Sequence, residues 1–185
     1  MSLNPYAPPA AAVADLAPPD DLSTQPPFFA VSVTKLVIMS ACTFNLYEIY
    51  WFYRQWRRIA DRENDLIWPL ARAIFGIIFC YSCFGRIRDY DADTRTGSTL
   101  AAGPLATAWI VTTLLWRLPD PYWWISMFAF LFLVPVQVHV NKLNAASSPL
   151  HDRNARLTAW NWLAVVFGGL VVILALSSPF LPEAE

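Results

Sequence analysis

Long apolar runs separated by short polar segments dominate the chain from residue 31 onward. The runs cover residues 31–53, 66–88, 100–117, 121–144 and 158–177. A helix needs about 20 predominantly apolar residues to cross the roughly 30 Å of hydrocarbon in a bilayer, because each residue adds about 1.5 Å. The pattern therefore predicts an all-α integral membrane protein, a helical bundle with four or five transmembrane helices.

The end of the first run carries the clearest membrane signal. Residues 44–58 pass from aliphatic residues through a band of Tyr and Trp to arginines, which is the order met by a helix that leaves a bilayer. Only Lys35 precedes the uncharged part of this run, residues 36–47, and four arginines follow the run: Arg54, Arg57, Arg58 and Arg62. The positive-inside rule then predicts that residues 1–29 lie outside the cell and that the chain from Arg54 onward is cytoplasmic.

The run at 66–88 is shorter than a full crossing. Its uncharged part lies between Arg72 and Arg86 and amounts to about 20 Å of helix. Snorkelling of both arginines would let it cross, whereas an amphipathic helix embedded at 68–85, or a re-entrant segment, would keep it on the cytoplasmic side. The embedded reading, with four transmembrane helices, obeys the positive-inside rule better, and the five-helix reading stays open.

The two ends of the chain differ from its centre. Residues 1–29 are rich in Pro and Ala and predict an extended, disordered tail, either a tether or a Pro-rich ligand for a partner. Residues 30–182 form the predicted multi-pass transmembrane domain, and residues 183–185 are a short acidic end. The first residues lack the basic and apolar regions of a signal peptide, so no cleaved leader is expected.

Composition agrees with a membrane protein. Hydrophobic residues make up 56% of the chain and charged residues 15%, against about 45–50% and about 25% in soluble domains. The arginines lie beside apolar runs and do not form a nucleic-acid patch, so no nucleic-acid partner is expected. Cys80 and Cys83 form a C-x-x-C spacing inside an apolar run, where we interpret them as packing residues; redox chemistry, palmitoylation and metal binding are weaker alternatives.

Four polar residues are candidates for a role inside the membrane: Asn45, Glu48, Arg72 and Gln137. Ionisable residues at such depth are costly and usually face a partner or water. We expect Glu48 to pair with Arg72 and so to join the first two helices, unless it lies shallow enough to reach headgroup water. Gln137 shares a helix face with Asn141 and Asn144, where amides either join helices or line a polar cavity.

Two further patterns concern packing and metal binding. Ala164 and Gly168 give a small-x-x-x-small face for close helix packing, either within the chain or in a homo-oligomer. Asp89, Asp91 and Asp93 copy the opening of a calcium loop, but the Gly and Glu that such a loop requires are missing. We therefore interpret these aspartates as partners of nearby arginines, and we expect no metal site, no cofactor and no catalytic centre.

The aromatic motifs resemble a known group of proteins. Leu46-Tyr47-x-x-Tyr50-Trp51-Phe52-Tyr53-Arg54-x-Trp56, followed by Phe79-Cys80-Tyr81 and Arg86-Ile87-Arg88, resembles small uncharacterised bacterial inner-membrane proteins. Some of these also begin with an Asn-Pro-Tyr-x-Pro-Pro tail, as residues 4–9 do here. The resemblance covers about the first half of the chain. It implies a multi-pass protein of the bacterial inner (plasma) membrane, and it implies no activity or site residue.

Together these patterns predict a non-enzymatic interaction or accessory protein. Its partners are expected to be membrane lipids, further copies of itself or another membrane protein. The basic residues expected to face lipid or partner are Arg54, Arg57, Arg58 and Arg62, since each exposed basic residue near an anionic leaflet contributes about 1 kcal/mol. The alternative is a small oligomeric channel or a transporter subunit, in which Glu48, Arg72 and Gln137 would line the path.

Overall fold

The structure, a computed structural model, describes residues 25–64, 66–94, 99–119 and 122–177. Every regular element in these ranges is a helix, which confirms the all-α prediction. The acidic end at 183–185 and most of the expected tail lie outside the described residues. The elements in chain order are α1 (Val33–Cys42), α2 (Leu46–Glu63), α3 (Pro69–Ile74), α4 (Gly76–Thr94), α5 (Ala102–Leu114), η1 (Leu115–Arg117), η2 (Tyr122–Phe132), α6 (Leu133–Ser147) and α7 (Ala159–Ser177).

Within the described residues, two helical stretches are long and apolar enough to cross a membrane. One is the 26-residue stretch Tyr122–Ser147, formed by η2 and α6, and the other is the 19 residues of α7. The predicted count of four or five transmembrane helices is not found. The reason is that two of the expected spans are each divided between two shorter helices, and a third, α5, has 13 residues.

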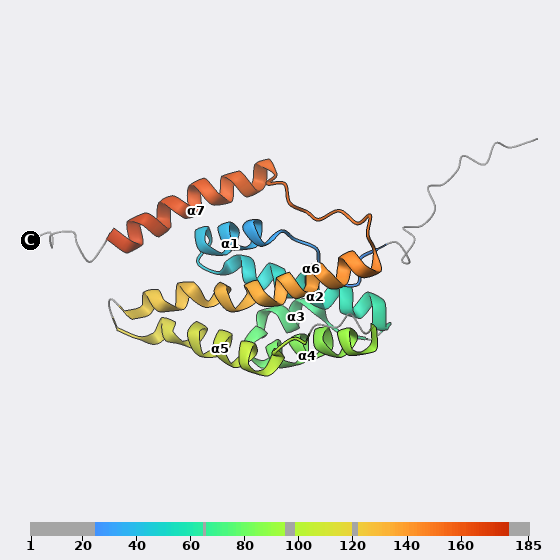
Figure 1. Cartoon of the computed structure of the whole chain (residues 1–185). Helices are drawn as coiled ribbons and strands as arrows, with labels where there is room; N and C mark the ends of the chain where they lie inside the picture. The colour runs from blue at the N-terminus through green and yellow to red at the C-terminus, as the bar shows by residue number, and fades with distance from the viewer. Residues whose placement is uncertain (1–24, 65, 95–98, 120–121, 178–185) are drawn as a thin grey trace, which may run out of the picture.

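The first expected span, 31–53, is wrong because the chain turns back in its middle. α1 ends at Cys42, and Phe44 and Asn45 then adopt left-handed backbone conformations with φ of 49° and 62°. The amide of Asn45 donates to the Ser40 carbonyl at 3.0 Å, and the Thr43 hydroxyl accepts the Tyr47 amide at 3.0 Å. Two consecutive left-handed residues cannot continue a right-handed helix. α1 and α2 therefore run in opposite directions (Figure 1).

This turn also corrects the predicted topology. Because α1 and α2 form a hairpin, the residues before α1 lie at the same end of the molecule as the arginines of α2. The Arg58 side chain donates to the Gln25 side chain, and Arg62 Nη1 donates to the Pro27 carbonyl at 3.3 Å. Residues 25–31 and the α2 arginines therefore lie together, rather than on opposite sides of a membrane.

The second divided span is 66–88, where α3 and α4 meet at Phe75. Pro69 lines a cavity with Ala60 near the end of α2, Gly76 lies against the ring of Phe52, and Arg86 pairs with Glu63. The chain thus runs toward the start of α2 and then returns along it. α4 continues to Thr94, so the polar segment between the apolar runs 66–88 and 100–117 is helical over its first six residues.

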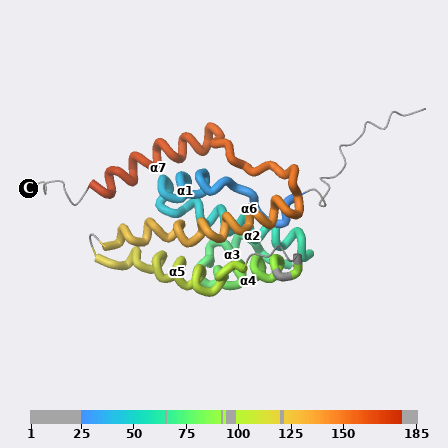
Figure 2. The backbone as a smooth tube through the Cα atoms, in the orientation of Figure 1, coloured from blue at the N-terminus to red at the C-terminus, as the bar shows by residue number. Residues whose placement is uncertain are grey.

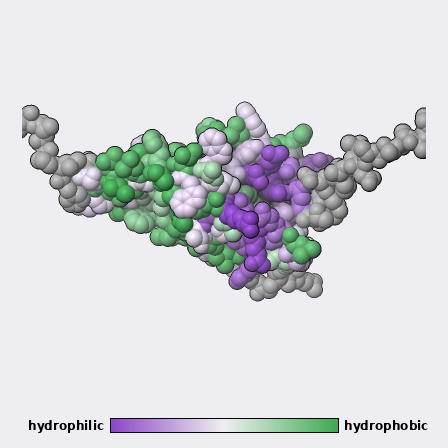
Figure 3. All heavy atoms as spheres, turned by 90° about the horizontal axis from the view of Figure 1, so that it is seen from above, coloured by the Kyte–Doolittle hydropathy of each residue, from purple (hydrophilic) through white to green (hydrophobic). Residues whose placement is uncertain are grey.

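The remaining helices extend away from the two hairpins. α5 and η1 lead away to Arg117, and η2 with α6 returns beside them; Figure 1 and the chain trace in Figure 2 show the start of η2 at the same end as the C-terminus of α7. We call this the far end. The opposite end, which we call the polar end, consists of residues 25–29, residues 54–64, residues 86–93 of α4, Ser147 and Ser148. Figure 3 shows hydrophobic residues toward the far end and hydrophilic ones toward the polar end.

The core forms around α2. Seven α2 residues are buried with the three- and four-residue spacing of one helix face: Tyr47, Glu48, Trp51, Phe52, Gln55, Trp56 and Ile59. The rings of Phe52 and Phe84 stack with centroids 6.2 Å apart, and Trp109 meets Phe52 edge-on at 4.9 Å. By contrast, α7 buries none of its residues. α7 comes close to the bundle at Gly168, where an added Cβ would lie 2.0 Å from the Cys42 carbonyl oxygen.

Candidate functional site at the polar end

An extended segment of the chain, residues 25–31, enters the helical bundle from the polar end. Phe28, Phe29, Ala30 and Val31 are all buried, and Ser32 then caps α1 by accepting the Lys35 amide at 3.2 Å. Buried backbone N–H and C=O groups must find partners, and an extended segment cannot supply them internally. The partners therefore have to come from the surrounding helices.

Side-chain amides on α6 and α2 supply them. Asn144 Oδ1 accepts the Phe28 N–H and Asn144 Nδ2 donates to the Phe28 carbonyl, both at 3.1 Å. One side-chain amide thus bonds to both backbone groups of Phe28, as a residue of an adjacent antiparallel β-strand would. Gln55 Oε1 accepts the Phe29 N–H at 3.1 Å. Every one of these bonds goes to the backbone, so it does not depend on the side chain that the segment carries.

Gln137 and Asn141 hold the next part of the segment. Gln137 Nε2 lies 3.3 Å from the Phe29 carbonyl and 3.2 Å from that of Val31, and Asn141 Nδ2 donates to the Val31 carbonyl at 3.0 Å. The orientation of Gln137 is fixed, because its Oε1 accepts the Trp51 indole N–H at 2.6 Å. We call Gln55, Gln137, Asn141 and Asn144 the amide clamp. The α6 amides were predicted from sequence to join helices or line a cavity, but here they hold an extended segment.

Three of the four candidate arginines contact the same segment. The Arg54 guanidinium lies 5.0 Å from the Phe29 ring centroid, and Arg62 lies 4.6 Å from that of Phe28 and 4.7 Å from that of Tyr90. Such contacts are favourable because the face of an aromatic ring is electron-rich. Arg58 and Arg62 also donate to the segment, as described above. Arg57 differs, since it is exposed.

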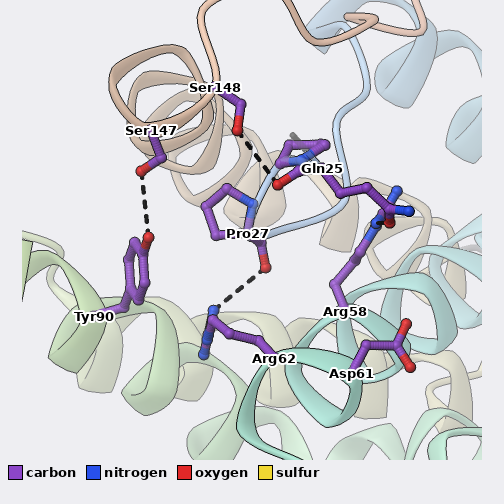
Figure 4. Close-up of a pocket in the computed structure, with 9 residues that line it drawn as sticks. Gln25, Pro27, Arg58, Asp61, Arg62, Tyr90, Ser147 and Ser148 are labelled. Carbon is purple, nitrogen blue, oxygen red and sulfur yellow. Dashed lines mark hydrogen bonds between the residues drawn. The ribbon is translucent and has the colours of Figure 1, made fainter. Parts of the chain in front are cut away.

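A cavity of 340 Å³ lies beside the segment at the polar end (Figure 4). Arg58 and Arg62 reach the segment from α2, on either side of Pro27, whereas Asp61 points away from it. Ser148 Oγ donates to the Gln25 carbonyl at 3.3 Å. The Tyr90 and Ser147 hydroxyls are 3.3 Å apart. The segment thus joins α2, α4 and the end of α6.

The predicted pairing of Glu48 with Arg72 is wrong. Glu48 is 3% exposed, and its Oε2 accepts the Trp109 indole N–H at 2.7 Å. The Arg72 guanidinium lies 4.5 Å from the ring centroid of Trp56. Trp56 and Glu48 are eight residues apart, or about 12 Å along α2. Arg72 therefore lies beside the second half of α2, too far along the helix to pair with Glu48 near its start. Glu48 joins α2 to α5 instead.

The other polar candidates lie in separate places. Asn45 lies in the α1–α2 turn and donates to the Ser126 carbonyl at 2.8 Å, which ties this turn to η2. Asn45, Glu48, Arg72 and Gln137 thus have four different sets of partners and do not form one site. No partner could be assigned from sequence, because each lies many positions away along the chain.

The structure agrees with part of what was predicted for the aspartates of α4 and with the predicted packing role of Cys80 and Cys83. Arg88 pairs with Asp89 at 2.8 Å, as the sequence analysis expected, whereas Asp91 is buried and lies 3.6 Å from His139 Nε2. Arg95 lies outside the described residues. Cys80 and Cys83 are fully buried within the hydrophobic core, in agreement with the interpretation as packing residues. The described residues contain no group of three or more His, Cys, Asp or Glu side chains that could hold a metal ion.

Comparison of the chain with protein-family models, with curated proteins and with solved structures found no match. The resemblance to small bacterial inner-membrane proteins therefore stays a prediction. The candidate site rests on the geometry alone: an extended segment held through its backbone by the amide clamp, with arginines on its aromatic rings.

Proposed function

We propose that this protein is an integral protein of the bacterial inner membrane that acts by interaction and not by catalysis. The observation that carries the proposal is α7. Its 19 residues are apolar enough to cross a bilayer and none is buried in the protein. Large apolar side chains are exposed along its length: Trp160, Trp162, Leu163, Val166, Phe167, Leu170, Ile173 and Leu174. A contiguous apolar surface of this kind needs lipid or another protein to cover it.

The division of the molecule suggests how it lies in the bilayer. η2 with α6, and α7, are long enough to cross. α5 with η1 covers 16 residues, or about 25 Å, and Arg117 at its end can snorkel to the surface. We propose three crossings and two hairpins, α1–α2 and α3–α4, which enter from the polar end and return to it. This arrangement replaces the four or five crossings predicted from sequence.

Charge supports a cytoplasmic location for the polar end. Among the described residues it carries the four α2 arginines together with Arg86 and Arg88, whereas the far end carries Arg117. The positive-inside rule places the richer end in the cytoplasm. Arg57, exposed there, is available to anionic lipid, while Arg54, Arg58 and Arg62 hold the 25–31 segment. No observation favours the channel alternative, because Glu48, Arg72 and Gln137 contact separate partners.

Single-cysteine labelling tests this arrangement. In a variant without the three native cysteines, Asn64→Cys and Asp93→Cys probe the polar end and Leu118→Cys probes the far end; all three residues are exposed. An impermeant thiol reagent should label Leu118→Cys in intact cells, and the other two only after lysis.

Two results would count against the proposal. Labelling of Asn64→Cys and Asp93→Cys on opposite sides of the membrane would mean that the α3–α4 region crosses it. Release of the protein from membranes by alkaline carbonate would mean that α7 is covered by protein and not by lipid. A peripheral protein from the same membranes serves as the extraction control.

A further inference from the structure

A second cavity, of 380 Å³, lies between α1, α2 and the start of α7. None of its polar lining residues is acidic. These residues are Lys35, Tyr47, Tyr50, Asn154, Thr158 and Asn161. Met39 completes the lining. The only formal charge in this lining is therefore the positive charge of Lys35.

Lys35 is buried although it is charged, with 5% of its surface exposed. Its Nζ donates to Asn154 Oδ1 and to the Arg156 carbonyl, both at 2.9 Å. When the Asn161 amide is turned so that its oxygen faces Lys35, it accepts a third bond at 3.0 Å. All three acceptors are neutral. Burial lowers the pKa of Lys35, and the charge of Asp152 raises it.

The three oxygens that hold the ammonium are neutral, and Asp152, whose negative charge acts on Lys35, forms no salt bridge with it. Burying a charge is expensive unless it is paired with an opposite one. Among the described residues no carboxylate forms a salt bridge with Lys35. An anion in the adjoining cavity would supply a counter-charge in addition to that of Asp152.

Tyr47 gives an independent indication of a ligand. It lines the same cavity, is 8% exposed, and its buried hydroxyl has no hydrogen-bond partner among the described residues. A buried polar group without a partner costs about 1–3 kcal/mol, so such groups usually have an unseen partner. A phenol hydroxyl can donate to an anionic oxygen.

The position of the cavity indicates the source of the anion. Trp160 and Trp162, in the first turn of α7, are 80% and 55% exposed. Exposed Trp and Tyr gather at the headgroup layer of a membrane. If α7 crosses the bilayer, as proposed above, the cavity at its start lies at the depth of the lipid phosphates on the polar side.

We infer that this cavity binds the phosphate of an anionic phospholipid, with the Lys35 ammonium as its counter-charge and the Tyr47 hydroxyl as a further donor. The inference rests on the proposed membrane location. It assigns a defined lipid site to Lys35, a residue that the sequence analysis treated only as a minor charge on the outer side.

Binding of phosphatidylglycerol to the purified full-length protein in detergent, followed by native mass spectrometry, tests the inference. Lys35→Gln should weaken binding roughly five-fold or more. Tyr47→Phe, which removes a hydroxyl that has no hydrogen-bond partner among the described residues, should weaken it about two- to five-fold without unfolding the protein. Lys142→Gln is the matched control, because it removes one exposed positive charge that lies outside this cavity.

The outcomes separate the possible sources of the anion. Equal binding by Lys35→Gln, Tyr47→Phe and the parent protein would overturn the inference. Inorganic phosphate at millimolar concentration that displaces the lipid completely would overturn the lipid assignment in favour of a small-anion site. Carbonate extraction tests the membrane location separately: a carbonate-soluble protein with Lys35-dependent phosphate binding would contradict the proposed function but not the anion site.

Discussion

The polar end and α7 are stabilised in different ways. At the polar end, an extended segment is enclosed by helices, and the amides of Gln55, Gln137, Asn141 and Asn144 bond to its backbone. α7 has no buried residue and lies close to the backbone at the end of α1 through Gly168. The polar end is thus stabilised by directional hydrogen bonds inside the protein. α7 is stabilised by close backbone packing, and its exposed apolar surface needs lipid or another protein to cover it.

The difference shows where sequence changes should matter. Replacement of a clamp amide leaves buried partners unpaired, so its cost should be large even when the volume is kept. Most α7 side chains point away from the bundle, so their replacement by other apolar residues should cost little. Gly168 is the exception, because it lies where two backbones meet.

The largest effect on stability is expected for Gln137→Leu. This change leaves the Trp51 N–H and the Phe29 carbonyl without a partner, whereas the Val31 carbonyl keeps its bond from Asn141. Each unpaired buried group costs about 1–3 kcal/mol. We expect the free energy of unfolding to fall by roughly 3 kcal/mol or more. Thermal unfolding in detergent measures it. Lys142→Leu, an exposed change on the same helix, is the control, and equal stability of the two variants would contradict the clamp.

The next effect concerns Gly168→Ala. The new Cβ would lie 2.0 Å from the Cys42 carbonyl oxygen, so α7 must move away from α1, at a cost of about 1–3 kcal/mol. Gly169→Ala meets only the Cys42 sulfur at 3.8 Å and should be neutral or stabilising, because Ala favours helix by about 1 kcal/mol over Gly. Melting temperatures that shift in the same direction for both variants would show that α7 does not pack as described.

A smaller effect separates the observed partner of Glu48 from the predicted one. Glu48→Gln keeps an oxygen that can accept the Trp109 N–H, so we expect a change below about 1 kcal/mol, whereas Glu48→Ala should cost about 1–3 kcal/mol. A double-mutant cycle of Glu48→Gln with Arg72→Gln should give a coupling energy within about 0.5 kcal/mol of zero. A larger favourable coupling would restore the pairing predicted from sequence.

The smallest effect is expected for Arg57→Gln. Arg57 is exposed, and such surface changes usually alter stability by less than about 0.5 kcal/mol. Arg62→Gln, one turn further along α2, should cost about 1–2 kcal/mol, since it loses the bond to the Pro27 carbonyl and the contacts with the Phe28 and Tyr90 rings. Limited proteolysis at residues 25–31 provides a second readout: only Arg62→Gln should expose the segment.

The sequence by itself determined the all-helical class and the division into apolar and polar parts, because apolar periodicity and the aromatic-to-arginine order are local properties of the chain. It also indicated the close packing at Gly168, since small residues four apart are visible in the sequence. The interpretation of Cys80 and Cys83 as packing residues followed from their apolar neighbours.

Only the tertiary structure decided how these parts meet. The turn at residues 43–45 depends on left-handed conformations at Phe44 and Asn45, and Phe gives no signal for such a conformation. The partners of the clamp are far apart in sequence, with Phe28 and Asn144 separated by 116 positions. Residues 25–29 looked like the end of a Pro-rich tail, because an extended segment has no periodicity of its own. Its burial follows from amides that the fold brings to it.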